Sequence, residues 1–203
     1  MNAYYRRLAF AWLVSIGTAC TSAPIRYYTL TPAPDPALRA ARTAAPIDVR
    51  VVHIPPQLDH SELIVRTGPA ETTLLDNERW ASPMKDEIKN AVRIELQRRL
   101  GETTGSASSF TKLAIDIDVQ RFEAELGRYA LFEATWRASL SDTGRPYGGS
   151  QVTTCAFRAD EEIRGGYAAM VEGYQREITA LADAIVSALV PGARGGAREN
   201  CRP

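Results

Sequence analysis

The side chains that most often carry acid, base or metal chemistry are scarce in this chain. Its 203 residues include two histidines, His53 and His60, which lie on either side of Pro55 and Pro56. Neither belongs to a His-Glu-x-x-His pattern, and no pair of neighbouring cysteines accompanies them, so the usual zinc-binding patterns are missing. We therefore expect both histidines to be surface or partly buried residues that bind no metal.

Several other short patterns resemble catalytic or ligand-binding motifs but have simpler explanations. Asp116 and Asp118 occupy alternate positions of an expected strand, which places both on its solvent face. Residues 142–144 (Asp-Thr-Gly) match the aspartic-protease tripeptide, yet they lie between two expected strands, where Asp and Gly favour a turn. Residues 101–105 lack the Lys-Ser/Thr of a phosphate-binding loop, and Ser150 lacks the flanking pattern of a nucleophile elbow. We predict that the protein is not an enzyme and needs no cofactor.

Cys20 lies where a lipid-anchored cysteine would lie. It follows a short positive region at Arg6 and Arg7, an apolar stretch over residues 8–16 and the small residues 17–19, and this order resembles a bacterial lipobox. We predict that residues 1–19 are a signal peptide, that Cys20 carries acyl chains, and that residues 20–26 form the anchor and a short tether. Thr21, in place of the aspartate that retains lipoproteins in the inner membrane, favours the outer membrane. Ordinary secretion, with Cys20 just inside the mature chain, is the alternative.

The two remaining cysteines, Cys155 and Cys201, are candidates for a disulfide. In an oxidising envelope compartment they can pair, because residues 192–203 are expected to form a flexible Gly-rich tail that could return to the strand with Cys155. The alternative is a buried Cys155 and a free terminus.

The overall composition excludes several classes of protein. The 24 basic and 24 acidic side chains cancel, so no basic excess favours nucleic-acid binding and no acidic block favours disorder. A hydrophobic content of 45% suits one globular domain. No apolar run reaches the roughly 20 residues that a transmembrane helix needs.

Hydrophobic periodicity indicates which elements position these residues. Alternating or β-branched runs predict strands, whereas apolar residues spaced three and four apart predict helices. Strands are expected at residues 27–30, 47–54, 62–67, 72–75, 113–119, 132–140 and 151–157, and helices at residues 83–100 and 167–189. Ser82 is the expected N-cap of the first helix.

These elements predict a single α/β domain with a mixed, mostly antiparallel β-sheet and two amphipathic helices packed on the same face. One helix on each face is the alternative, because Val49, Val51 and Val52 do not alternate cleanly with polar residues.

A set of motifs in a fixed order resembles the ABC-type transport auxiliary lipoprotein family, of the PqiC-like type. The motifs are YYTL (27–30), V-x-IPP-x-LD (52–59), ELIVR (62–66), ERWASPM (78–84) and DVQRFE (118–123), and the likeness spans about residues 20–190. Arg79 and Trp80 lie in the ERWASPM motif, where they would either contact a partner or support the fold. We expect Trp80 to lie in the core. Tyr27 and Tyr28 are expected to pack in the sheet.

The resemblance implies a non-enzymatic envelope lipoprotein whose domain covers residues 27–191. Such a protein would act with an MCE-domain protein and with ABC permease and ATPase subunits in transport of lipids, solvents or toxic compounds between the two membranes. It would lie at the outer membrane, facing the periplasm, and association with a second copy is left open. Two alternatives are a lipid or peptide carrier with a cleft between helices and sheet, and a hydrolase with a histidine beside a nucleophile.

Overall fold

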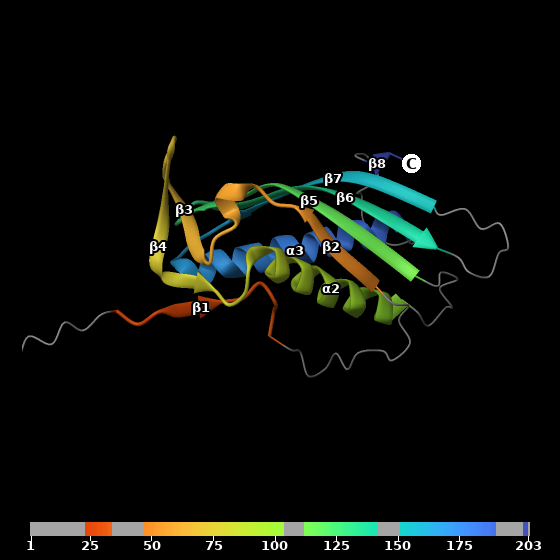
Figure 1. Ribbon diagram of the computed structural model, residues 1–203, viewed down its shortest axis with the longest axis horizontal. Helices are drawn as coiled ribbons and strands as arrows, with labels where there is room; N and C mark the ends of the chain where they lie inside the picture. The colour runs from red at the N-terminus through yellow and green to blue at the C-terminus, as the bar shows by residue number, and fades with distance from the viewer. Residues whose placement is uncertain (1–22, 34–46, 104–111, 142–150, 190–200, 203) are drawn as a thin grey trace, which may run out of the picture.

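The computed structural model describes residues 23–33, 47–103, 112–141, 151–189 and 201–202. Figure 1 shows strands layered over two α-helices, with a small hairpin standing at one end. In chain order the elements are β1 (Arg26–Tyr28), β2 (Ile47–His53), the 3-10 helix η1 (Pro56–Leu58), β3 (Glu62–Gly68), β4 (Glu71–Trp80), α2 (Met84–Thr103), β5 (Lys112–Glu125), β6 (Tyr129–Ser141), β7 (Gln151–Glu162), α3 (Tyr167–Leu189) and β8 (Cys201–Arg202).

The larger sheet has five strands in the order β2-β5-β6-β7-β8. β2 runs parallel to β5, and every other neighbouring pair is antiparallel. The expected alternation is confirmed in β5, where the apolar residues are buried on one face while Asp116 and Asp118 lie on the other. The turn from β5 to β6 requires Gly127, which has a φ of 74°.

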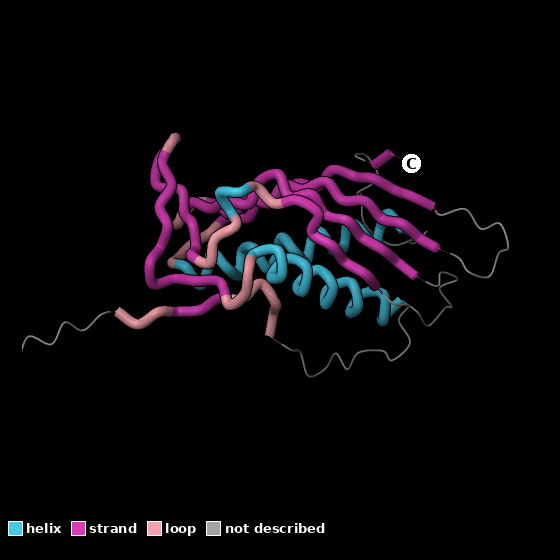
Figure 2. The backbone as a smooth tube through the Cα atoms, in the orientation of Figure 1, coloured by secondary structure: helices cyan, strands magenta, loops and turns pink. Residues whose placement is uncertain are grey.

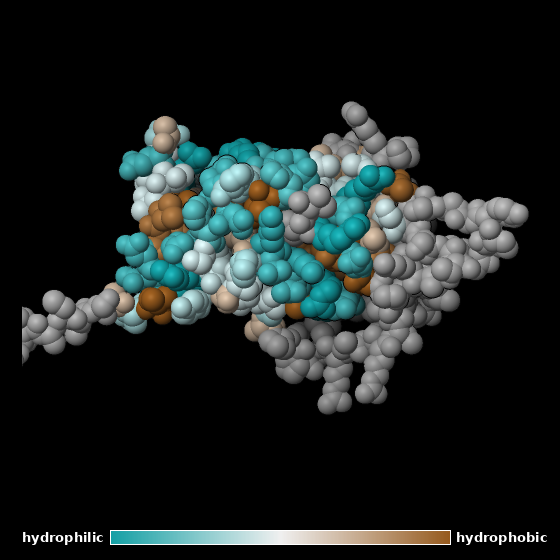
Figure 3. Space-filling view, viewed as in Figure 1, coloured by the Kyte–Doolittle hydropathy of each residue, from teal (hydrophilic) through white to brown (hydrophobic). Residues whose placement is uncertain are grey.

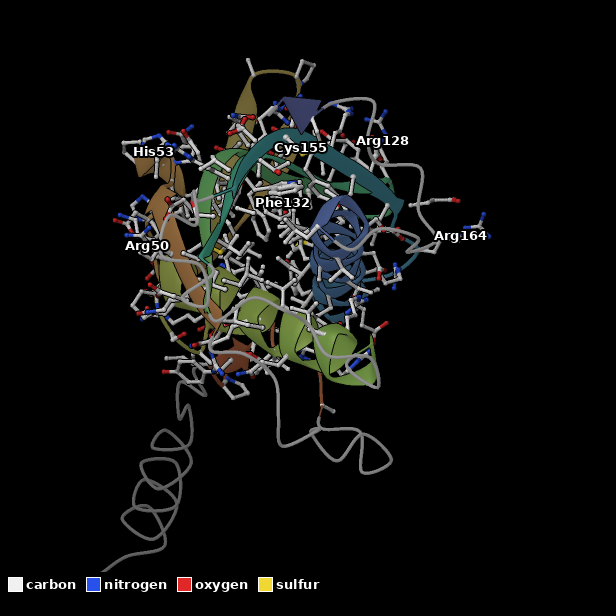
Figure 4. All side chains as sticks on the ribbon, turned by 90° about the vertical axis from the view of Figure 1, so that its right-hand side faces the viewer. Arg50, His53, Arg128, Phe132, Cys155 and Arg164 are labelled. Atoms are coloured by element: carbon white, nitrogen blue, oxygen red, sulfur yellow. A yellow bond between two sulfur atoms is a disulfide. The ribbon has the colours of Figure 1, made fainter. Side chains whose placement is uncertain are left out.

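Both helices cover the same face of this sheet. α2 packs against α3 and β2, whereas α3 packs against β6 and β7. Figure 2 shows the two helices side by side beneath the strands, and Figure 4 shows Phe132 pointing from β6 into the space between the layers. The alternative with one helix on each face is therefore not observed. Neither helix in the described part of the chain is long and apolar enough to cross a membrane.

The expected single sheet is divided into two, although the fold class is confirmed. The smaller sheet has the order β1-β4-β3, with β1 parallel and β3 antiparallel to β4. Register shifts lie near both ends of the β3–β4 pairing, between Glu62 and Leu63 and between Arg66 and Gly68. Irregularities of this kind bend strands, and the β3–β4 hairpin stands across one end of the larger sheet (Figure 1).

The core joins both sheets to the helices through an aromatic cluster. Phe122 of β5 stacks on Tyr174 of α3 with ring centroids 3.9 Å apart, and Trp80 of β4 lies 6.3 Å from each of them. Phe132 meets the edge of Phe122 at 5.5 Å. These rings fix the end of β4 against the β5–α3 layer.

Candidate functional site

The N-terminal strand is held by a buried carboxylate from the ERWASPM motif. Glu78 of β4 is 5% exposed and is the register partner of Arg26 in β1. Arg26 Nε donates to both carboxylate oxygens, at 2.9 and 3.0 Å, and Arg26 Nη2 also contacts Oε1. The Tyr28 hydroxyl donates to Oε2 at 2.7 Å. One carboxylate thus binds two side chains of the strand that follows the predicted anchor.

A second buried carboxylate holds the residues that follow this strand. Glu87, in the first turn of α2, is 4% exposed. Its Oε2 accepts hydrogen bonds from the Thr29 hydroxyl and the Leu30 backbone N–H, both at 2.8 Å. The Ser82 hydroxyl donates to Oε1 at 2.7 Å, so this predicted N-cap residue bonds the Glu87 side chain. We call Glu78 and Glu87, with the residues 26–30 that they hold, the N-terminal clamp.

The charge states of the clamp match its hydrogen bonds. Burial would raise the pKa of the Glu78 carboxyl, but the hydrogen bonds from Arg26 and Tyr28 outweigh it and hold that pKa below its usual value. The hydrogen bond to Glu78 raises the pKa of Arg26, and burial followed by the same kind of bond raises the pKa of Tyr28. At neutral pH the contact around Glu78 therefore consists of a carboxylate, a guanidinium and a neutral phenol.

Two further motif residues join the two sheets. Arg66, at the end of the ELIVR motif in β3, donates from Nη2 to Glu123 Oε2 at 2.9 Å. Glu123 belongs to the DVQRFE motif in β5 and also accepts a hydrogen bond from the Tyr129 hydroxyl at 3.1 Å. Burial alone would raise the pKa of Glu123. The hydrogen bonds from Arg66 and Arg121 lower it by more, so the pKa lies below its usual value. This pair fixes the β3–β4 hairpin to the larger sheet.

Arg79 and Trp80 lie in different environments. Trp80 is buried in the aromatic cluster. Arg79 is partly exposed, forms an ion pair with Glu62 at 3.4 Å, and donates from Nε to the Asp76 carbonyl at 3.4 Å. Tyr27, the register partner of Arg79, was expected to pack in the sheet, but its side chain is 65% exposed. Its strand neighbours Arg26 and Tyr28 bond Glu78, which leaves Tyr27 without a place in the sheet packing, although the Arg26 side chain is also 62% exposed.

A small pocket lies beside Trp80, lined also by Leu58, Ile64, Met84 and Tyr174. It encloses about 10 Å³, which is the room that a single water molecule needs. The acyl chain of a lipid requires a far larger apolar cavity.

The other residues with potential for chemistry stay apart. His53 and His60 are both exposed, and Figure 4 shows His53 and Arg50 pointing outward from β2. Arg50 forms an ion pair with Asp116 at 2.7 Å, while Asp118 is exposed. Within the described residues no three His, Cys, Asp or Glu side chains are grouped as a metal site would require. Residues 142–144 and Ser150 lie outside the described residues.

The cysteines divide into two groups. Cys155 of β7 and Cys201 of β8 are joined by a disulfide, and the two residues are register partners. Residues 201–202 of the predicted tail thus add a strand to the edge of the larger sheet. Cys20 lies outside the described residues.

The structure is a small α/β domain in which motif residues bond the N-terminal strand to the body and join the two sheets. Among the described residues, no histidine, cysteine and carboxylate side chains are grouped as a metal site would require. A family model of the ABC-type transport auxiliary lipoprotein component matches residues 28–186, so the chain belongs to that family. The protein is an auxiliary lipoprotein component of ABC-type transport systems. Membership implies a non-catalytic role and a lipid-anchored place in the cell envelope.

Two solved structures show the same fold. The structure of an uncharacterized protein aligns with a TM-score of 0.62 at 17% sequence identity, over 83% of this chain and 100% of that chain. A protein from Xanthomonas campestris aligns with a TM-score of 0.50 at 19% identity, over 82% of this chain and 94% of that chain. A search of curated proteins gave no match.

Proposed function

We propose that this protein is the outer-membrane accessory subunit of an MCE/ABC-type system that moves lipids, or solvents and toxic compounds, between the two membranes. In this proposal residues 1–19 are removed, acyl chains on Cys20 hold the protein, and the domain over residues 27–191 faces the periplasm. Its partners are an MCE-domain protein and ABC permease and ATPase subunits. The protein contributes binding surface rather than chemistry.

The N-terminal clamp is the observation that carries this proposal. Arg26 follows Cys20 by six residues, which span at most about 22 Å when fully extended. Because Glu78 and Glu87 fix residues 26–30 to the domain, the body can move only a short way from the membrane. A lipoprotein held in this way suits a docking subunit at a membrane-bound assembly.

Affinity capture tests the partner. The full chain with a tag after Pro203 is expressed in its native envelope, and detergent-solubilised membranes are passed over the affinity resin. We expect an MCE-domain protein and an ABC permease to be recovered, while an unrelated tagged outer-membrane lipoprotein recovers neither. Recovery of the tagged protein from membranes without any MCE or ABC component would contradict the proposal.

The membrane assignment has a separate test at Thr21. In an enteric host, Thr21→Asp should move the protein from the outer to the inner membrane fraction, whereas Thr21→Ser should leave it in the outer membrane. If the unsubstituted protein fractionates with the inner membrane, the outer-membrane part of the proposal is wrong.

A further inference from the structure

The large apolar side chains that are exposed in the described residues gather on the smaller sheet. Ile25 is 47% exposed just before β1, Tyr27 is 65% exposed within it, and Leu74 is 46% exposed on β4. Figure 3 shows brown, hydrophobic atoms at the end of the molecule where β1 and the β3–β4 hairpin lie. Single exposed apolar residues are common, so their position relative to the rest of the chain decides what they mean.

Ile25 and Tyr27 are the two that lie near the proposed anchor. Ile25 follows Cys20 by five residues and Tyr27 by seven, so the extended chain can separate them from Cys20 by at most about 18 and 25 Å. A cysteine that carries acyl chains stays at the membrane surface, because its chains lie in the hydrocarbon layer. Leu74 is much farther along the chain and is not part of the inference.

The clamp sets which face of β1 is available. The Arg26 and Tyr28 side chains both bond Glu78, which is buried, although the Arg26 side chain itself stays 62% exposed. Ile25 and Tyr27 alternate with them and remain exposed. Ile25 and Tyr27 therefore offer an aliphatic and an aromatic side chain to the outside, and the exposed Arg26 between them is ion-paired with Glu78.

We propose that Ile25 and Tyr27 insert into the headgroup region of the membrane that holds Cys20, so that the edge strand β1 is a second membrane contact. This inference rests on the proposed lipid anchor. Tyrosine is suited to this position, since its ring can enter the apolar boundary while its hydroxyl stays among the headgroups. Arg26 is paired with Glu78, so the contact does not require anionic lipid.

The test places a tryptophan at the contact. Mature Tyr27→Trp protein, acylated at Cys20 and without residues 1–19, is purified and reconstituted into vesicles of phosphatidylethanolamine and phosphatidylcholine. The vesicles are made with or without brominated phosphatidylcholine, which quenches nearby tryptophan. The matched control is Gln97→Trp, at an exposed position in the C-terminal half of α2. The native Trp80 and Trp136 are buried and give a common background. Ile25→Trp repeats the test at an independent position.

We expect brominated lipid to quench the added emission of Tyr27→Trp and Ile25→Trp but not that of Gln97→Trp. If all three variants float with the vesicles and none is quenched, the contact is absent although the anchor holds, and the inference is overturned. If the protein does not float with the vesicles, the anchor itself fails, and the proposed function falls with the inference. If the Tyr27→Trp emission shifts to the blue only after transport proteins are added, the strand binds a protein partner instead. If it shifts without lipid as the protein concentration is raised, the strand binds a second copy of the chain.

Discussion

Glu78 and Glu87 receive hydrogen bonds from residues 26–30, which precede them by 50 to 58 positions in the sequence. Carboxylates are rarely buried unless they are paired, and here both oxygens of each carboxylate accept hydrogen bonds. The ERWASPM motif indicates Arg79 and Trp80 as notable residues. It does not reveal that Glu78 is buried, because the burial of a carboxylate depends on partners that only the folded chain brings near. A glutamate next to a buried tryptophan in a strand is the signal that could have indicated it.

Replacement of Glu78 tests the first of these contacts. Glu78→Gln should lower the free energy of unfolding by about 1–2 kcal/mol at pH 7, because it replaces charge-assisted hydrogen bonds with neutral ones. The pKa of Glu78 is lowered in the folded state, so its contribution is present above the unfolded pKa of about 4.5 and is lost as the pH falls through the folded pKa. Urea titrations at pH 7 and pH 3 should show the difference shrink in acid.

The control for that substitution is Asp76→Asn, on the same strand with an exposed side chain. It should change the stability at pH 7 by less than about 0.5 kcal/mol. Equal effects of the two substitutions would contradict a special role for Glu78.

Glu177 is a buried carboxyl group of a different kind. It is completely buried in α3, and neither carboxyl oxygen has a hydrogen bond of good geometry. Burial, with repulsion from Glu161 and Asp160 on β7, raises its pKa to about 9, while Arg176 on its own helix and the nearby backbone of Glu161 lower it by less. The folded protein therefore keeps a proton that the unfolded chain releases above about pH 4.5, and its stability falls as the pH rises from about 4.5 to 9.

Glu177→Gln should remove this loss. The stabilisation that it gives should be about 2 to 4 kcal/mol larger at pH 8 than at pH 5, as measured by urea unfolding at both values. Glu172→Gln, at an exposed position of the same helix, should show no such pH dependence. A stabilisation by Glu177→Gln that is the same at both pH values would show that Glu177 ionises normally in the folded protein.

At the scale of the elements, local patterns predict some parts of the chain well. α3 spans Tyr167–Leu189, the range that its apolar spacing predicts, because the whole stripe faces one sheet. β4 is predicted over residues 72–75 but continues to Trp80. Asp76 and Asn77 are typical turn residues, yet they stay in the strand because its end pairs with β1. The division into two sheets depends on such distant pairings, which periodicity does not encode.

β8 illustrates the same limit on a shorter scale. Two residues carry no periodicity, and their place on the sheet edge depends on Cys201 meeting Cys155, 46 positions earlier. Cys201→Ser should lower the free energy of unfolding by about 2–4 kcal/mol, since the closed loop restricts the unfolded chain. Guanidinium chloride titrations should show that a reductant destabilises the unsubstituted protein and has no further effect on Cys201→Ser. Insensitivity of the unsubstituted protein to reductant would contradict a stabilising disulfide.

At the scale of the whole molecule, the motif residues join elements of the fold to one another. The clamp joins the N-terminal strand to the body, and the Arg66–Glu123 pair joins the small sheet to the large one. The N-terminal strand and the small sheet are thereby bonded to the same body as the large sheet. This arrangement supports the proposed role, in which the lipoprotein offers a docking surface close to its membrane.

The residue on which this account depends is Cys20, and palmitate labelling tests it most directly. Cells that express the full chain are grown with radioactive palmitate, and the protein is immunoprecipitated and analysed on a gel. We predict that the unsubstituted protein and Cys201→Ser incorporate the label, and that Cys20→Ala incorporates none. Label that persists in Cys20→Ala, or is missing from the unsubstituted protein, would contradict the lipid anchor at Cys20.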